Sequence, residues 1–509
     1  MKKAFKRIGA IALASLIMIG CTESAFAQDR SYTYNYDYWG DVQDSPDFYS
    51  VVKVFTSADL GLDKNFMNPS GLYIHDESIF VCDSGNNRII EFVKDGSDGL
   101  KVKSIIDSIK GNTDVKELSG PTDIAISEDG NIFICDKGNS RIVKTDANLN
   151  FLQEFTKPVD NTLESDLVYA PNKLVVDTAE RVYCIASGIN KGLIKYEADG
   201  TFSGFVGASP AAHNLWQYII KKFMTQEQLA KVEAFVPTEY DNICMDKEGF
   251  VYACTGTVAE EDLKKGDVDA VRKLNLLGND ILVRNGVYYD GDYPVYGDLY
   301  MGNGGGVDGA SYFSDVTVFD NDIYVCLDKK RGRLFSYDDQ GRLMYACGGL
   351  GNMDGYFRRP IALDHMGYDL FVLDQLDCAI TMFTPTDFGR LVYEAKDTFD
   401  DGEYDISKAD WEEVIRLNGN YDLAYIGIGR AYLRQKDYKT AMEYFELKYD
   451  DENWSKAYRQ YRKFWVEENI VPIVIIILLL FLVPFSIGKV KAIKHEIKVA
   501  DIFKYNEEK

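Results

Sequence analysis

Histidine is scarce in this chain of 509 residues, and the scarcity limits the chemistry open to it. The four histidines are His75, His213, His365 and His495. No two of them have the spacing that places a pair of zinc ligands on one helix face. The sequence also lacks a Gly-x-Ser-x-Gly nucleophile elbow and a phosphate-binding loop. We therefore expect no enzyme of these types and no bound cofactor.

Basic residues are also fewer than acidic residues. The 56 Lys and Arg residues face 80 Asp and Glu residues, which gives a formal net charge of −24. Because binding to nucleic acid phosphates requires a basic surface, this balance argues against nucleic acid as a partner. It suits an acidic surface exposed outside a cell.

Long hydrophobic runs occur only near the two ends of the chain. Residues 1–27 have a basic start, a short apolar core and a small-x-small site at Ala25–Ala27, which predicts an export signal. Lipid attachment at Cys21 is the alternative form of processing. Residues 470–488 are apolar over a length that spans a membrane, and a lysine-rich segment follows. The positive-inside rule then places residues 489–509 in the cytoplasm and the rest of the mature chain outside.

Nine cysteines are present, yet their positions do not indicate disulfides. Cys82, Cys135, Cys254 and Cys326 each follow a short apolar run at a similar place in a repeated unit. Equivalent positions in radiating sheets are expected to lie too far apart for a bridge. We interpret them as small buried residues with free thiols.

The repeated unit organises the chain. Cys82-Asp83-Ser84-Gly85-Asn86-Asn87-Arg88-Ile89 recurs as Cys135-Asp136-Lys137-Gly138-Asn139-Ser140-Arg141-Ile142. Alternating apolar residues predict strands on each side, and the Asp/Gly/Asn clusters predict tight turns. A unit of about four strands that repeats every 45 to 70 residues is typical of a propeller blade.

These residues resemble the NHL repeat, whose Asp and Arg are matched within a blade. The candidate turn pairs are Asp83 with Arg88, Asp136 with Arg141, and Asp328 with Arg333. Six units are counted, with second strands near Phe80, Phe133, Tyr183, Tyr252, Tyr324 and Phe371. The resemblance covers residues 50–395 and implies a mainly β fold, a six-bladed β-propeller. We expect the Asp and Arg pairs to be structural.

Residues 28–49 alternate tyrosine with polar residues, which predicts an extended segment lying on the propeller. A more specific interpretation of the same pattern is a surface on which the tyrosine rings stack against sugar rings. The run Val51–Phe55 predicts a strand that joins the last blade and closes the ring.

Two insertions flank the fourth unit. Residues 209–236 have helical spacing and a capping box, and residues 286–312 form a Gly/Tyr-rich loop. Long loops on a rigid scaffold often carry function. The candidate binding residues are Trp216, Tyr288, Tyr289, Tyr293 and Tyr296.

Helical periodicity begins near residue 405 and continues to residue 468. Amphipathic runs at residues 409–417, 421–433 and 439–447, with small residues such as Gly429 and Ala441, resemble a tetratricopeptide repeat. Because one such repeat rarely stands alone, we expect it to dock on the propeller or on a partner.

The whole layout predicts a single-span, bacterial cell-surface protein that binds a protein or carbohydrate partner. It resembles NHL proteins of Gram-positive bacteria thought to accompany sugar uptake systems. The competing hypothesis is a metal-dependent lactonase, because some six-bladed propellers of the gluconolactonase type hold a metal in the central channel. The candidate channel residues for that alternative are Asp123, Asn172, Asp241 and Asp315.

Overall fold

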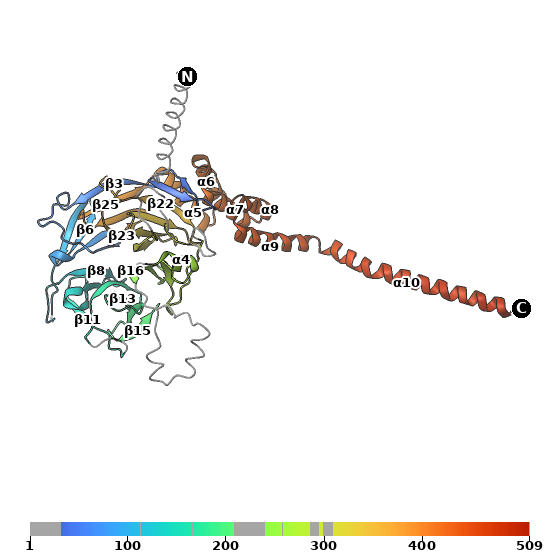
Figure 1. The fold of residues 1–509 in the computed structure, drawn as a ribbon, viewed down its shortest axis with the longest axis horizontal. Coiled ribbons are helices and arrows are strands. Elements are labelled where there is room, and N and C mark those ends of the chain that lie inside the picture. Colours follow the sequence, from blue (N-terminus) through green and yellow to red (C-terminus); the bar gives the residue numbers. More distant parts are fainter. Residues whose placement is uncertain are drawn as a thin grey trace, which may run out of the picture.

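The computed structural model describes residues 32–111, 113–161, 163, 166–207, 240–256, 258–285, 295–298 and 309–507. Six antiparallel sheets form its main body, and a group of helices leads to one long helix that projects away from them (Figure 1). The six-bladed β-propeller predicted from the repeats is confirmed. The expected export signal and the insert at residues 209–236 lie outside the described residues.

Within each blade the strands pair in chain order. Blade one holds β4 (Gly71–His75), β5 (Ser78–Asp83), β6 (Arg88–Lys94) and β7 (Leu100–Ile106), and blade two holds β8 (Pro121–Ile126), β9 (Ile132–Asp136), β10 (Arg141–Thr145) and β11 (Phe151–Phe155). Blade three holds β12 (Pro171–Val176), β13 (Val182–Ala186), β14 (Leu193–Tyr196) and β15 (Phe202–Val206), and blade four holds β16 (Tyr240–Met245), β17 (Val251–Thr255) and β18 (Val271–Leu274), with α4 (Glu260–Lys265) between the last two. Blade five holds β19 (Phe313–Val318), β20 (Tyr324–Asp328), β21 (Arg333–Tyr337) and β22 (Leu343–Gly348), and blade six holds β23 (Pro360–Met366), β24 (Asp369–Asp374) and β25 (Ala379–Pro385).

The ring is closed by an N-terminal strand. The first strands of neighbouring blades contact one another all the way round, and β23 of blade six returns to β4 of blade one. Strand β3 (Tyr49–Thr56) pairs antiparallel with β25, from Thr56 opposite Ala379 to Tyr49 opposite Pro385. This confirms the predicted closing strand, which gives blade six its fourth, outer strand.

The segment before β3 enters a sheet instead of lying on the propeller surface. Strand β1 (Thr33–Tyr36) pairs with β22, and β2 (Val42–Asp44) pairs with β1, so blade five has six strands. Tyr34 and Tyr36 are buried, and both hydroxyls donate to Asp298. The tyrosine alternation is therefore not one exposed stacking surface. Only the turn between the two strands leaves its aromatic residues in solvent.

The Asp turn of the repeat is a buried anchor. In blade one, Asp83 is fully buried and accepts from Arg88 Nε at 2.9 Å and from the backbone N–H of Met67 at 2.7 Å. Blade two repeats the arrangement with Asp136, Arg141 and Ser119. In the turn of blade one, glycine is required at Gly85 because a Cβ atom there would come within 2.4 Å of the Met67 carbonyl oxygen.

The third expected pair is wrong. Asp328 is bonded by Arg331 Nη1 at 3.3 Å, whereas Arg333 Nη1 bonds Tyr34 Oη at 2.7 Å and Asp298 Oδ2 at 3.2 Å. The cause is the buried carboxylate of Asp298, which attracts the Arg333 side chain away from its own turn.

The helices predicted for residues 405–468 are present and pack on the propeller, and one further helix, Asp387–Asp400, precedes them where the propeller was expected to continue to residue 395. They are α5 (Asp387–Asp400), α6 (Tyr404–Leu417), α7 (Asp422–Arg434), α8 (Tyr438–Leu447) and α9 (Asp451–Glu468), and each packs against the next. A single hydrophobic core joins Phe388 and Tyr393 of α5 to Phe48 and Tyr345 of the propeller. Gly429 allows the close approach expected of small residues, since a Cβ would come within 2.7 Å of the Phe445 ring.

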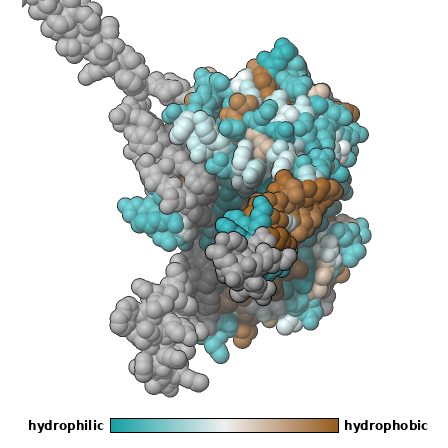
Figure 2. Space-filling view, turned by 90° about the vertical axis from the view of Figure 1, so that its right-hand side faces the viewer, coloured by the Kyte–Doolittle hydropathy of each residue, from teal (hydrophilic) through white to brown (hydrophobic). Residues whose placement is uncertain are grey.

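Helix α10 (Ile470–Glu507) leaves this body entirely. It is long and apolar enough over Ile470–Val499 to cross a membrane, and none of that apolar stretch is buried against the rest of the chain. Figure 2, seen from the side on which α10 projects, shows its hydrophobic surface against a largely hydrophilic body. The chain therefore has one candidate membrane span among the described residues.

All eight cysteines within the described part of the chain are free, as expected. Burial and a neighbouring Cys326 thiol raise the pKa of the Cys254 thiol. These two thiols lie close together, contrary to the expectation of wide separation, because Cys254 and Cys326 differ by one residue in strand register and so lie on facing sides of adjacent blades.

The Asp anchor can be tested by substitution. Arg88→Ala should lower the free energy of unfolding by about 3–5 kcal/mol, because it leaves the buried Asp83 carboxylate without its charged partner. Urea denaturation measures the change. The control is Arg358→Ala, which removes a half-exposed pair with Asp377 at 3.1 Å and should cost less than about 1 kcal/mol. Equal losses in the two variants would contradict the anchoring role.

Candidate functional site in the central channel

The first strands surround a channel with one cavity toward each end. One cavity, of about 330 Å³, is lined by Asp123, Lys173, Asn242, Asp315 and Asp364 among others. Its polar residues come from first strands of different blades, which place their side chains toward the axis. The cavity is therefore a polar chamber built jointly by the blades.

Asp123 and Lys173 form the charged centre of this chamber. Lys173 Nζ lies 3.6 Å from Asp123 Oδ1, and both residues are buried. Burial raises the pKa of Asp123, although Lys173 opposes the effect. Burial acts to lower the pKa of Lys173, but Asp123 and Asp315 outweigh it and the net direction is upward. The ammonium group is therefore held in its charged form beside two carboxyl groups.

Asp315 is a second buried carboxyl group in this chamber. Its Oδ2 accepts from the backbone N–H of Leu363 at 2.7 Å, and its Oδ1 accepts from Val316 N–H at 2.8 Å. Burial raises the pKa of Asp315 to about 7, and Lys173 only partly opposes that shift. Asp315 can therefore change charge near neutral pH.

Three channel carboxylates connect one blade to the next. Asp123 Oδ2 accepts from Leu174 N–H at 2.9 Å, which links blade two to blade three. Asp315 links blade five to blade six in the same way, and Asp364 Oδ2 links blade six to blade one through Ile74 N–H at 2.6 Å. Thr317 Oγ1 donates to Asp364 Oδ1 at 3.0 Å and lies 2.7 Å from His365 Nδ1. The three carboxylates therefore have a structural role, since each is hydrogen-bonded to the backbone of the next blade.

The four channel residues expected for a metal are not brought together. Asp123 and Asp315 line the 330 Å³ chamber, whereas Asn172 and Asp241 line a separate cavity of about 720 Å³. Asn172 accepts from Lys137 Nζ at 2.6 Å, and Asp241 Oδ2 lies 3.8 Å from Lys329 Nζ. With a lysine beside Asp123, Asn172 and Asp241, this donor set does not fit one metal ion.

The register of the first strands explains the difference. Blades two to six share one bulge near the start of this strand, and the chamber residue is the one that follows it, two positions after Pro121, Pro171 or Tyr240. Lys173 and Asn242 are therefore equivalent to Asp123, whereas Asn172 and Asp241 lie one residue earlier, and neighbouring residues of a strand face opposite sides. The complete ring at this level is Gly71, Asp123, Lys173, Asn242, Asp315 and Ala362. These six ring residues can be found in the sequence by aligning the units on their second strands, where Cys82 matches Cys135.

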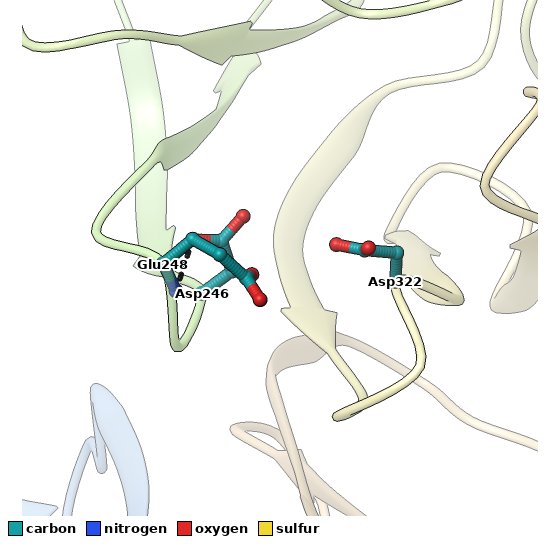
Figure 3. Close-up of side chains that lie close together, drawn as sticks. All are labelled: Asp246, Glu248 and Asp322. Atoms are coloured by element: carbon teal, nitrogen blue, oxygen red, sulfur yellow. Dashed lines mark hydrogen bonds between the residues drawn. The ribbon is translucent and has the colours of Figure 1, made fainter. Parts of the chain in front are cut away.

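A second acidic group lies at the turns of blades four and five. Among the described residues, Asp246, Glu248 and Asp322 have carboxylate oxygens within 4.8 Å of one another, and they face each other in Figure 3. Lys273 Nζ lies 2.9 Å from Asp246 Oδ2 and 3.3 Å from Asp322 Oδ1. The position that a cation would take is thus neutralised by an ammonium group of the chain itself.

One of the five residues expected to form an aromatic binding surface is described by the structure. Trp216, Tyr288, Tyr289 and Tyr293 lie outside the described residues. Tyr296 is described and is buried in the core, where it bonds Val283 O at 3.1 Å and Tyr324 Oη at 3.0 Å. Its assignment to an exposed binding surface is wrong, because the chain re-enters blade five at this residue.

Comparison with known proteins identifies the repeat. Residues 118–144 match the NHL repeat, and this stretch holds Asp123, Asp136 and Arg141. No curated protein matches the chain. The chain is thus a six-bladed β-propeller protein that contains an NHL repeat and ends in helices.

Several solved propeller structures are similar at low identity. Virginiamycin B lyase from Staphylococcus aureus is 10% identical, with 66% of this chain and 99% of that chain covered and a TM-score of 0.37. A protein of unknown function from Bacteroides thetaiotaomicron is 10% identical, with 68% and 79% covered and a TM-score of 0.38. The WD40 repeats of RRP9 are 11% identical, with 67% and 99% covered and a TM-score of 0.40.

The titration of Asp315 predicts a pH dependence. Its folded pKa of about 7 lies above the ordinary 3.8, so the unfolded chain loses this proton first and stability falls as pH rises from about 4 to 7. Asp315→Asn removes the titration and keeps an acceptor for Leu363 N–H. The melting temperature of the variant minus that of the unmodified protein should therefore rise across this window. A difference that stays constant from pH 4 to 8 would contradict the assignment.

Proposed function

We propose that this protein is a membrane-anchored binding module that presents its propeller outside the cell and binds a partner without cleaving it. The observation that carries the proposal is the occupation of the channel acids. Asp123, Asp315 and Asp364 each accept a backbone N–H from the next blade, and Lys173 pairs with Asp123. Lone pairs engaged in this way are poor ligands for a catalytic metal.

The proposed anchor is α10. Its apolar stretch is followed by Lys489, Lys491, Lys494 and Lys498, which favours a cytoplasmic C-terminus. The predicted export signal agrees with this orientation. The span therefore attaches the acidic ectodomain to the outer face of the membrane.

The proposed partner is a protein or a glycan, and the protein could serve as an accessory to a sugar uptake system. The tetratricopeptide-like interpretation of α6, α7 and α8 supports a role in binding, because paired helices of that kind present surfaces to peptides and proteins. The inserts at residues 209–236 and 286–312 are proposed as further contact loops. A rigid scaffold with long loops is suited to such a role.

A metal-dependent lactonase is the alternative, favoured by the shared chamber of Asp123 and Asp315. The full-length protein should not hydrolyse glucono-δ-lactone above the uncatalysed rate, with calcium or with a chelator present. Lys173→Met, which removes the competing ammonium group, should remain inactive as well. Calcium-dependent hydrolysis that is lost in Asp123→Asn would overturn the binding role in favour of the enzyme.

Topology provides an independent test. Protease added to intact cells should release a large fragment and leave an epitope tag after Lys509 intact, because only the ectodomain is exposed. Immunoblotting of cells and medium measures both products. Loss of the tag with a protected propeller would show the opposite orientation.

A further inference from the structure

One aromatic group on the surface is formed by two segments far apart in the sequence. Tyr38 and Trp39 lie in the turn between β1 and β2, and Tyr449 lies in the turn between α8 and α9. The ring centroid of Tyr449 lies 4.7 Å from that of Tyr38 and 5.7 Å from that of Trp39. We call these three residues the aromatic platform.

The platform remains exposed. Tyr38 is 51% exposed, Trp39 is 69% exposed and Tyr449 is 53% exposed. Tyr34 and Tyr36, in the same hairpin, are buried and bonded to Asp298. The hairpin thus buries the aromatic residues that stabilise it and leaves two others in water.

The backbone of Tyr449 is unusual for its residue type. It has φ of 55°, just after the end of α8, where a helix commonly ends with glycine in the left-handed conformation. A bulky side chain is disfavoured in that conformation. The ring gains little from burial in return, so its presence is better explained by a surface role than by stability.

Polar groups surround a pocket of about 190 Å³ beside the rings. They are Asp37, Gln43, Asn420, Asp422 and Lys448. Asp37 Oδ1 accepts from Trp39 N–H at 2.9 Å, and Gln43 Nε2 donates to Asp37 Oδ2 at 3.1 Å. Lys448 Nζ lies 2.6 Å from Asp422 Oδ1. These contacts hold the polar groups in place before any ligand arrives.

We propose that the aromatic platform and this pocket bind a neutral oligosaccharide. A pyranose ring has an apolar face that stacks on an exposed aromatic ring, and its hydroxyl groups match neighbouring carboxylate, amide and ammonium groups. Two carboxylates against one lysine, in a protein of net charge −24, disfavour acidic glycans. This inference rests on the proposed function, since it identifies the partner class of the ectodomain.

The test uses the full-length protein in nanodiscs, which avoids detergents with sugar head groups. Maltohexaose, cellohexaose, xylohexaose and mannohexaose are titrated by isothermal calorimetry. At least one should bind, and Trp39→Ala should weaken that binding about tenfold or more, the scale expected for loss of one stacked ring. Binding by none of the four sugars at millimolar concentration would overturn the proposal.

A second variant separates binding from folding. Tyr449→Gly removes the ring and relieves the left-handed backbone, so sugar affinity should fall about tenfold while the melting temperature stays equal or rises. Tyr458→Ala removes another exposed tyrosine, on α9, and should leave affinity unchanged. Affinity that survives both Trp39→Ala and Tyr449→Gly would place the sugar elsewhere and overturn the proposal.

The outcomes also separate this inference from the proposed function. If none of the sugars bind and protease shaving still finds the propeller outside, the platform inference fails and the membrane-anchored module stands. If the C-terminal tag proves to be outside, the proposed function fails whatever the sugar titration shows.

Discussion

One hydrogen-bond pattern holds most blades in shape: a buried carboxylate at the end of the second strand accepts the N–H of the loop that enters the same blade. The pairs are Asp83 with Met67, Asp136 with Ser119, Asp328 with Tyr312 and Asp374 with Arg358. The loop would otherwise bring an unpaired backbone N–H to a buried site. In blades three and four Ala186 and Thr255 stand at this position, so this carboxylate is absent. Blade three keeps only the backbone bond from Ser187 N–H to Ala170 O, which corresponds to the bond from Gly85 N–H to Met67 O in blade one.

A second set of carboxylates works between blades. Asp123, Asp315 and Asp364 each accept an N–H from the first strand of the following blade, so the channel wall is bonded across three blade boundaries. Strand β3 closes the ring through the backbone, on the outer side of blade six. Polar residues in the channel therefore contribute to the propeller's stability, and their presence alone does not indicate catalysis.

The sequence allowed the blades to be predicted, because Asp/Gly/Asn turns and alternating strands are local signals. The channel ring was missed at Lys173 and Asn242, because Asn172 and Asp241, one residue earlier in each strand, are also polar and only the strand pairing separates the two positions. Arg333 was paired wrongly for a related reason. Its partner Asp298 lies 35 residues upstream in an inserted loop, and only the folded chain brings the two together.

The helices place the aromatic platform close to the membrane attachment in the chain. Helix α9 starts two residues after Tyr449 and ends at Glu468, and α10 follows at Ile470. An 18-residue helix is about 27 Å long, so the platform lies within roughly that distance of the span. Because α5 shares a core with blades five and six, the helices cannot move freely against the propeller. A ligand that bridges the β1–β2 turn and Tyr449 would therefore strengthen the contact between the propeller and the helix leading to the membrane.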